Sequence, residues 1–326
     1  MSVSIVIPCY RSSSTLTPLV SRINQVMTGL AVPHEVILVV DGSPDDTWEV
    51  ARKLAADEPA VRAVQLARNY GQHNALLAGI RLARYPVTIT MDDDLQHPPE
   101  EIPVLLRALT DDLDLVYGVP ANEEHGFARS FASRLVKAGL AGATGARNAK
   151  MLSALRVFRT FLRDGFEQIQ GPYVSVDVAL SWGTARVSSA QVRMDKRRDG
   201  RSGYTFKSLV RHAINLVIGY STAPLRLVTY FGLLTGAVGV ALAIRALWLY
   251  FDGATTVAGF TTLVTMVAIF CGAQMIGIGV LGEYLGRIHF RGMGRPSYVV
   301  RDDVRMVTEI DDATDVEPLV RQRVTR

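Results

Sequence analysis

The sequence predicts an α/β domain with a mostly parallel sheet, followed by two helices long enough to cross a membrane. Two observations predict this fold class. Within residues 2–120, short apolar runs rich in β-branched residues alternate with amphipathic stretches, as in strands joined by crossover helices. Later in the chain, two apolar runs each exceed the ~20 residues that cross ~30 Å of hydrocarbon.

The predicted sheet begins at the N-terminus, and its strands alternate with helices. The strand candidates are residues 3–7, 35–40, 61–66, 87–91 and 113–117. Helical stretches are expected between them, near residues 15–29, 46–57, 73–84 and 100–110. The chain opens on a strand pattern that has no basic region and no cleavage site, so the N-terminus is not expected to be a signal peptide.

Polar clusters directly follow successive strand candidates. They are Tyr10-Arg11-Ser12, Asp41-Gly42-Ser43, Arg68-Asn69 and Asp92-Asp93-Asp94. In parallel α/β sheets, ligands bind at the carboxyl ends of the strands. We therefore expect these clusters to meet at one edge of the sheet and to form the functional site.

The composition restricts the class of protein. Hydrophobic residues make up 48% of the 326 residues, and they are concentrated in the two long apolar runs. Cys9 and Cys271 both lie in apolar segments, which excludes a cysteine metal site, argues against a disulfide and fits a reducing compartment. The net charge is +4, but no basic stripe with interleaved aromatic residues accompanies it. Anionic substrates and lipid headgroups are therefore expected as partners, and nucleic acid is not.

The apolar runs cover residues 227–251 and 257–284, and the amphipathic stretch 206–226 before them suits a membrane interface. The expected organisation is a main domain (1–205), a juxtamembrane segment (206–226), a transmembrane hairpin (227–285) and a charged tail (286–326). Arg245 lies near the end of the first run, where its side chain can reach the interface. The alternative is a buried helical hairpin of a soluble protein.

The basic residues near the apolar runs lie outside the pair and not between its members. They are Lys207, Arg211 and Arg226 before the pair, and Arg287, Arg291 and Arg295 after it. The link at 252–256 contains no Lys or Arg. Because positive charge accumulates on the cytoplasmic side, we expect the main domain and both termini to be cytoplasmic.

The acidic cluster Asp92-Asp93-Asp94-Leu95-Gln96 is the strongest chemical signal. Alternate residues of an extended segment point the same way, so the carboxylates of Asp92 and Asp94 are expected to converge. With the amide oxygen of Gln96, they suit a hard cation such as Mg²⁺ or Mn²⁺, which in turn binds diphosphate oxygens. The alternative is a solvated acidic turn. The residues that follow, Pro98-Pro99-Glu100-Glu101, have the pattern of a helix start, and this argues against that alternative.

The segment 41–47 after the second strand allows two interpretations. Asp41 is able to accept hydrogen bonds from a base or a ribose, and Gly42 allows a close approach of the backbone to a ligand. Alternatively, the segment is a turn with a helix N-cap supplied by Ser43 or Asp45. The motif alone leaves both open.

Several motifs occur here in the order in which one family has them. They are Val6-Ile7-Pro8-Cys9-Tyr10, Val40-Asp41-Gly42-Ser43, Arg68-Asn69-Tyr70-Gly71-Gln72, the acidic cluster with Pro98-Pro99-Glu100, and Arg197-Arg198-Asp199-Gly200-Arg201-Ser202-Gly203-Tyr204. On these residues the chain resembles the bacterial polyprenyl-phosphate glycosyltransferases, relatives of dolichol-phosphate mannose synthase in inverting glycosyltransferase family 2. The resemblance covers about residues 2–290 and implies a GT-A fold.

The resemblance implies roles for particular residues. Nucleotide contacts are implied for Pro8, Tyr10, Asp41, Ser43 and Asp93. The implied metal set is Asp92, Asp94 and Gln96, with Asp93, Asp94 and Arg197 in the catalytic group. The lipid phosphate is assigned to Arg129, Arg134, Arg197 and Ser202, since guanidinium and hydroxyl groups bind phosphate well, although each Arg also reads as a surface charge.

The chain departs from the family pattern at three places. Arg11-Ser12 replaces an Asn-Glu pair, and Ser202-Gly203-Tyr204 lacks the lysine of Ser-Lys-Tyr. The stretch 153–159 lacks a carboxylate that relatives often have there. A phosphate monoester is largely anionic at neutral pH, so such an acceptor hardly needs a general base. Asp177 is a candidate substitute acid.

The resemblance therefore implies inverting transfer of a sugar from a UDP- or GDP-sugar to undecaprenyl or decaprenyl phosphate at the cytoplasmic membrane face. The product would be a polyprenyl monophosphosugar for cell-envelope glycosylation, and relatives of this architecture are often homotetramers. The alternatives are a processive polysaccharide synthase, an inactive membrane scaffold and a flippase. Against a synthase, the chain has only the two apolar runs and no Gln-x-x-Arg-Trp motif after the acidic cluster.

Overall fold

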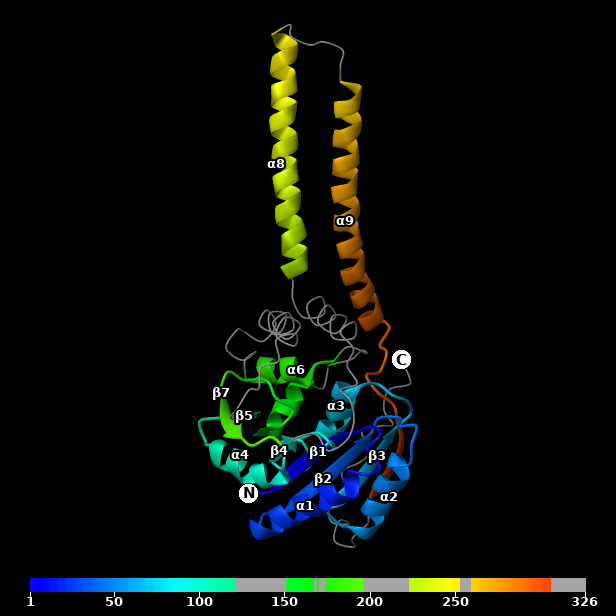
Figure 1. The fold of residues 1–326 in the computed structure, drawn as a ribbon, viewed down its shortest axis with the longest axis vertical. Helices are drawn as coiled ribbons and strands as arrows, with labels where there is room; N and C mark the ends of the chain where they lie inside the picture. Colours follow the sequence, from blue (N-terminus) through cyan, green and yellow to red (C-terminus); the bar gives the residue numbers. More distant parts are fainter. Residues whose placement is uncertain (121–150, 167–168, 170–173, 196–222, 253–258, 306–326) are drawn as a thin grey trace, which may run out of the picture.

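A computed structural model describes residues 1–120, 151–166, 169, 174–195, 223–252 and 259–305. It has an α/β domain from which two long helices extend together (Figure 1). The α/β class and the mostly parallel sheet predicted from the sequence are confirmed.

The sheet orders its strands β7-β5-β6-β4-β1-β2-β3-β8. Their bounds are β1 Val3–Cys9, β2 His34–Val40, β3 Val61–Leu66, β4 Val87–Thr90, β5 Leu115–Pro120, β6 Arg156–Arg159, β7 Val187–Val192 and β8 Val300–Arg305. Strands β1 to β4 run parallel to one another, and β6 lies antiparallel between β4 and β5. The carboxyl ends of β4 and β5 therefore lie at the same edge as those of β1, β2 and β3.

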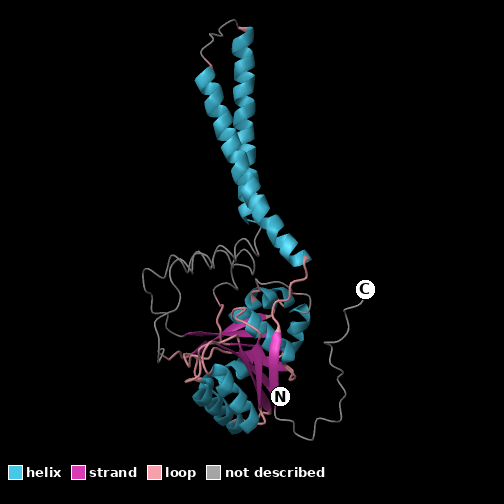
Figure 2. Ribbon diagram, turned by 90° about the vertical axis from the view of Figure 1, so that its right-hand side faces the viewer, coloured by secondary structure: helices cyan, strands magenta, loops and turns pink. Residues whose placement is uncertain are grey.

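Helices cover both faces of the sheet (Figure 2). One face packs against α1 Leu16–Gly29, α2 Thr47–Asp57, the 3₁₀ turn η1 Pro99–Glu101 and α4 Ile102–Ala108. The other face packs against α3 Gln72–Leu82, η3 Thr160–Phe166 and α6 Val176–Gly183. Apolar residues that alternate along the strands supply both cores, because successive side chains of a strand point to opposite faces.

Within residues 1–120, the element bounds agree closely with the sequence prediction, apart from one helix and one strand. The helix expected near 100–110 is divided into η1 and α4, since Pro99 and Pro103 lack the N–H groups that a continuous helix needs. The strand expected at 113–117 lies at Leu115–Pro120. Within α3, Gly79 approaches the sheet so closely that a Cβ there would lie 3.0 Å from Val39 Cγ2.

Strand β8 was not expected from the sequence. It joins the edge of the sheet antiparallel to β3, although its residues follow α9 and had been placed in the charged tail. The guanidinium of Arg62 donates two hydrogen bonds to the carboxylate of Asp303, with N···O distances of 2.9 and 2.6 Å. Charged side chains suit an edge strand that faces solvent. Because the segment is charged and not apolar, the sequence did not predict a strand there.

The segment between α9 and β8 also contacts the domain. Ser297 is buried, and its hydroxyl donates to the carbonyl of Ile169 over 3.3 Å. The Arg81 guanidinium lies 5.6 Å from the ring centroid of Tyr298 and donates a 2.8 Å hydrogen bond to the Phe166 carbonyl. The chain therefore returns from the second long helix into the sheet domain.

The two long helices are α8 Ala223–Phe251 and α9 Phe260–Gly292. Both are long and apolar enough to cross a membrane, with 18-residue windows at Leu225–Leu242 and Ile269–Gly286 whose mean hydropathies are 1.6 and 1.3. Neither window is buried, so within the described residues the pair is not the buried hairpin considered as an alternative. Large apolar side chains such as Trp248 and Ile276 are 74% and 62% exposed.

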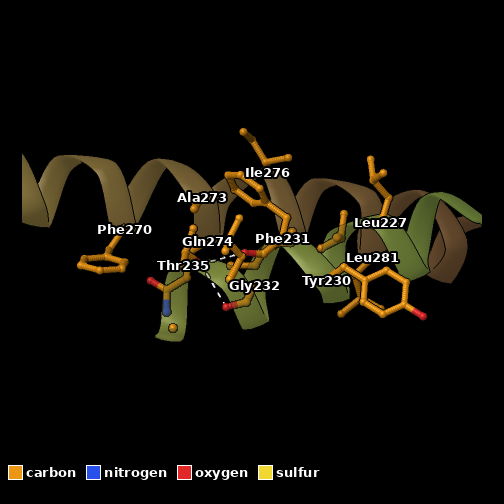
Figure 3. A pocket seen from close by; sticks show the side chains of 15 residues that line it. Leu227, Tyr230, Phe231, Gly232, Thr235, Phe270, Ala273, Gln274, Ile276 and Leu281 are labelled. Carbon is orange, nitrogen blue, oxygen red and sulfur yellow. Dashed lines mark hydrogen bonds between the residues drawn. The ribbon is translucent and has the colours of Figure 1, made fainter. Parts of the chain in front are cut away.

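A groove of about 970 Å³ runs between α8 and α9. Figure 3 shows the side chains around it, among them Phe231 from α8 and Phe270 and Gln274 from α9. The hydroxyl of Thr235 donates to the carbonyl of Phe231 over 3.0 Å, so it needs no hydrogen-bond partner from the groove. The lining is almost wholly apolar.

Candidate active site at the carboxyl edge of the sheet

The loops after β1, β2, β3 and β4 meet at one edge of the sheet, as the polar clusters predict. Hydrogen bonds join the loop after β1 to the acidic cluster, and others join the loop after β2 to the loop after β3. The Arg11 N–H also donates to the Ser43 hydroxyl over 2.8 Å and joins the loops after β1 and β2.

Asp93 turns back toward the loop after β1. Its Oδ2 accepts a 3.1 Å hydrogen bond from the Tyr10 N–H and another from the Ser12 hydroxyl. Burial raises the pKa of the Asp93 carboxyl, and these two hydrogen bonds oppose the rise. Asp93 thus holds the β1 loop against the acidic cluster and fixes where Tyr10, which is 43% exposed, stands.

Asp41 organises the loop after β3. Its Oδ1 accepts the Tyr70 N–H over 2.7 Å, and its Oδ2 accepts the Gly71 N–H over 2.8 Å. Burial raises the pKa of this carboxyl, and the two backbone hydrogen bonds counteract the rise. The structure thus shows Asp41 bound to protein backbone, a contact that neither interpretation included, and the carboxylate has lone pairs left for a ligand.

Gly42 holds a position that no other residue suits. Its φ is +56°, and a Cβ on it would overlap with the backbone of Arg68 and Asn69. A left-handed conformation and a close approach thus coincide at this residue. The loops after β2 and β3 consequently pack backbone against backbone beside Asp41.

Ser43 and Asp45 form the turn before α2. The Ser43 hydroxyl donates to Asp45 Oδ1 over 2.5 Å, and the same oxygen accepts the Thr47 N–H over 3.3 Å and the Thr47 hydroxyl over 2.6 Å. The segment is thus the predicted turn, but the N-cap of α2 is Asp46 and not Ser43 or Asp45, and no side-chain hydrogen bond caps the helix. Ser43 is also exposed enough to meet a ligand beside the loop after β1.

Asp92 and Asp94 follow β4 and are half-buried. Asp92 Oδ1 accepts a 2.6 Å hydrogen bond from Gln72 Nε2, the first residue of α3. Asp94 Oδ1 accepts the Gln96 N–H over 3.1 Å, and the turn between them has Leu95 at φ +61°. The Gln96 carbonyl accepts the Asp195 N–H over 2.8 Å, which joins the turn to the segment that follows β7.

The donor set fits a hard divalent cation that a substrate completes. Among the described residues, no three His, Cys, Asp or Glu side chains are grouped as a metal site. Mg²⁺ and ions like it commonly take only one or two carboxylates and complete their shell with water and phosphate oxygens. Asp92, Asp94 and Gln96, the residues predicted to bind a metal, lie together in the turn that follows β4, and all three have side-chain oxygens that can act as ligands.

The remaining predicted residues differ in what the structure says of them. Pro8 is a buried residue of β1 opposite Val39, so its ring does not line the open edge. The four residues assigned to the lipid phosphate, with Arg197 also assigned to catalysis, lie outside the described part of the chain: Arg129, Arg134, Arg197 and Ser202.

The stretch that lacks the family acid forms β6, and Asp177 stands beside it. The buried guanidinium of Arg156 forms an ion pair with Asp177 and donates from Nε to the Thr90 hydroxyl over 2.9 Å. The Tyr117 hydroxyl lies 3.4 Å from the same Asp177 oxygen. Burial raises the pKa of Tyr117, so its hydroxyl stays protonated and donates.

Sequence reasoning missed two residues that support the site. Ser12, at a departure from the family pattern, is buried and binds Asp93, and its own N–H donates to the Thr47 hydroxyl over 2.9 Å. Gln72 is the last residue of the motif Arg68-Asn69-Tyr70-Gly71-Gln72, and the sequence predicted no function for it. Its place at the start of α3, just past the carboxyl end of β3, was a usable signal because such residues face the ligand edge.

Known proteins resemble the chain in sequence and in fold. The family model of glycosyl transferase family 2 matches residues 4–170. The chain is 33% identical over 312 residues to the undecaprenyl-phosphate 4-deoxy-4-formamido-L-arabinose transferase of Pectobacterium atrosepticum, covering 95% of each chain. It is 34% identical over 311 residues to the transferase of the same name from Aeromonas hydrophila, covering 94% of this chain and 95% of that one.

Among solved structures, the α/β domain is similar to glucosyl-3-phosphoglycerate synthase from Mycobacterium tuberculosis in complex with Mn²⁺ and UDP-glucose. The TM-score is 0.50 at 18% identity, over 67% of this chain and 77% of that chain. This likeness concerns the fold, and it agrees with the GT-A fold expected from the sequence. The family model and the two relatives establish that the chain belongs to glycosyl transferase family 2.

Proposed function

We propose that this protein transfers a sugar from a nucleotide sugar to a polyprenyl phosphate, with inversion at the anomeric carbon. The observation that carries the proposal is the match along almost the whole chain to transferases named for undecaprenyl phosphate, at 33% and 34% identity. The structure supports it, since one chain joins a carboxylate-rich ligand edge to two exposed apolar helices.

The nucleotide lies over β1, β2 and β3 in this proposal, and its diphosphate reaches the acidic cluster. Tyr10, Asp41 and Ser43 surround the nucleoside end, while Pro8 and Asp93 shape the loop after β1. Asp92, Asp94 and Gln96 would hold Mg²⁺ or Mn²⁺, and the bound cation would offset the negative charge that develops on the leaving diphosphate. Arg197, placed in the catalytic group from the sequence alone, would add positive charge to the same reaction.

The acceptor phosphate is the nucleophile. One of its oxygens attacks the anomeric carbon while the bond to the nucleoside diphosphate breaks, and the bonding electrons leave with the diphosphate. Because the phosphate is already largely anionic near neutral pH, no proton has to be removed first. What the chain supplies is alignment of the two substrates, and the proposed phosphate-binding residues are Arg129, Arg134, Arg197 and Ser202.

The lipid end of the acceptor requires a membrane location. We place α8 and α9 across the inner membrane, with the catalytic domain and both chain ends in the cytoplasm, as the flanking basic residues suggest. A lipid phosphate would then meet the catalytic domain at the membrane surface. A homotetramer is compatible with the exposed helices, since a Cβ added to Gly232 or Gly236 of α8 would meet no described atom within 4 Å.

The relatives' names make 4-deoxy-4-formamido-L-arabinose the first sugar to test. The experiment incubates purified protein and undecaprenyl phosphate in nanodiscs with Mn²⁺ and a panel of UDP- and GDP-sugars, including pentoses with an acylated amine at C4. Mass spectrometry of the lipid extract should show one donor that adds its sugar to the lipid phosphate. If no donor changes the lipid mass while free UDP or GDP still binds, the proposed reaction is wrong.

A further inference from the structure

A row of polar side chains crosses the sheet on the side of β4 away from the nucleotide loops. Arg156 of β6 is paired in register with Thr90 of β4 and with Tyr117 of β5. Residues directly opposite on neighbouring strands point to the same face. Asp177, in the first turn of α6, completes the row through its ion pair with Arg156. Thr90 is the last residue of β4, so the row lies at the carboxyl edge.

Two short paths of contacts connect Asp177 with Asp92. In one, Arg156 bonds Asp177 and Thr90, which precedes Asp92 by two residues. In the other, the backbone N–H of Val176, next to Asp177, lies 3.4 Å from His73 Nδ1, and Gln72 beside His73 binds Asp92. Asp177 therefore belongs to the same edge as the acidic cluster.

The order of the strands decides which part of the donor reaches Asp177. In a nucleotide sugar the diphosphate stands between the nucleoside and the sugar. With the nucleoside over β1, β2 and β3 and the diphosphate at the end of β4, the sugar extends over β6 and β5, because these strands lie on the other side of β4. The row formed by Thr90, Arg156, Tyr117 and Asp177 is under that position.

The chemistry of the row suits recognition better than packing. Arg156 is 2% exposed, and a buried ion pair contributes little net stability, so hydrophobic residues would serve a purely structural role as well. The Asp177 side chain is 16% exposed, and both of its contacts use Oδ1. Within the described residues Oδ2 has no hydrogen-bond partner, which leaves an acceptor at the surface of the site.

We propose that Asp177 is a specificity-determining residue that accepts a hydrogen bond from a hydroxyl or N–H of the donor sugar, and that Arg156 is its positioning residue. The proposal rests on the proposed function and adds the feature of the substrate that Asp177 recognises, which is a hydrogen-bond donor on the sugar ring. A sugar that lacks this group leaves Oδ2 of the half-buried Asp177 carboxylate without a hydrogen-bond partner among the described residues, which is a strong basis for discrimination.

The test compares two affinities in the full-length protein with Mn²⁺, one for the donor that the panel selects and one for its free UDP or GDP. Asp177→Asn should raise the Kd of the nucleotide sugar about tenfold, because it replaces a charged acceptor, and leave the Kd of the free nucleotide unchanged. Deoxy analogues of the donor sharpen the test. The analogue without the recognised group should bind wild type and Asp177→Asn equally well.

Two further variants keep the outcome readable. Asp177→Glu retains a carboxylate for Arg156 but moves it, so it should fold and still change the ranking of donors. Asp114→Asn is the matched control: this carboxylate, which accepts a 2.7 Å hydrogen bond from Thr184, is buried at the opposite edge of the sheet. It should lower the melting temperature without changing the ratio of the two Kd values.

The results separate the two proposals. Equal effects of Asp177→Asn on the nucleotide sugar and the free nucleotide, or no effect on either, would overturn the role of Asp177 while lipid glycosylation by the wild type stands. An unchanged donor ranking in Asp177→Glu would count against it in the same way. A panel in which no donor modifies the lipid would contradict the proposed function and, with it, the sugar contact.

Discussion

Gln72 Nε2 donates a 2.6 Å hydrogen bond to Asp92 Oδ1, across the gap between the start of α3 and the end of β4. The bond fixes the orientation of one carboxylate in the proposed metal set. A carboxylate that is already oriented loses less conformational freedom when it takes up an ion, and supporting hydrogen bonds of this kind tune metal affinity.

Gln72→Ala should therefore weaken Mn²⁺ binding by about tenfold without unfolding the protein. Titration followed by electron paramagnetic resonance measures the free Mn²⁺ directly, with no need for turnover. Glu49→Ala, which breaks an exposed ion pair with Arg52 on α2, is the control and should leave the Mn²⁺ affinity as it is. Equal affinities in Gln72→Ala and wild type would show that the hydrogen bond does not prepare the site.

Gly42→Ala should lower the free energy of unfolding by about 1–3 kcal/mol, because the new Cβ meets the backbone of Arg68 and Asn69 at a strained φ. Nucleotide affinity should fall as well, since the loop that carries Tyr70 must shift. Gly29→Ala provides the contrast. No described atom lies within 4 Å of a Cβ there, so that change should be neutral or stabilise by about 0.4–1 kcal/mol. Chemical denaturation of both variants checks the pair.

Asp41 and Glu100 should make opposite contributions to the pH dependence of stability. Burial raises the pKa of Asp41, so the folded state binds its proton more tightly than the unfolded chain, and its contribution falls as pH rises from about 4 through the raised pKa. The Arg22 hydrogen bond lowers the pKa of Glu100, so its contribution is present above the unfolded value and is lost as pH falls through the lowered one.

Melting temperatures of wild type, Asp41→Asn and Glu100→Gln between about pH 7.5 and about pH 3 measure these contributions. On acidification, the melting temperature of wild type should rise relative to that of Asp41→Asn and fall relative to that of Glu100→Gln. Parallel curves for the two variants would contradict the assigned directions.

A chain that ends after Gly294 should be markedly less stable than one that ends after Arg305. The shorter chain lacks β8 and the Ser297 contact, and it leaves the edge of β3 unpaired, which favours aggregation. Asp303→Ala alone should cost at most about 1 kcal/mol, because its ion pair with Arg62 is partly exposed. Thermal unfolding and light scattering of the three proteins decide whether the strand or the ion pair matters.

Local patterns were sufficient to predict the parallel half of the sheet. Strands β1 to β4 are mainly apolar, and the helices between them are amphipathic, so each element can be recognised from its own residues alone. The polar clusters could be placed at one edge because parallel strands bring their carboxyl ends together. The predicted contact between these loops is what the hydrogen bonds of Asp41 and Asp93 display.

Long-range pairing concealed the rest. Strand β8 pairs with β3, and the side chains of Arg62 and Asp303 that connect the two strands are 241 positions apart in the sequence. The charged six-residue sequence of β8 does not indicate which strand it pairs with. The Arg156–Asp177 pair joins a strand to a helix, and Gln72 reaches a carboxylate on another loop. Side-chain contacts of this kind depend on the tertiary fold, which composition and periodicity do not encode residue by residue.

The yield of glycosylated undecaprenyl phosphate from wild type and Asp94→Asn, measured by mass spectrometry with the selected donor and Mn²⁺, tests the central claim most directly. A metal-stabilised leaving group is worth several kcal/mol, so the variant should be slower by about a hundredfold or more. EDTA should abolish the wild-type reaction. Full activity of Asp94→Asn, or a wild-type reaction that EDTA leaves unchanged, would contradict the account.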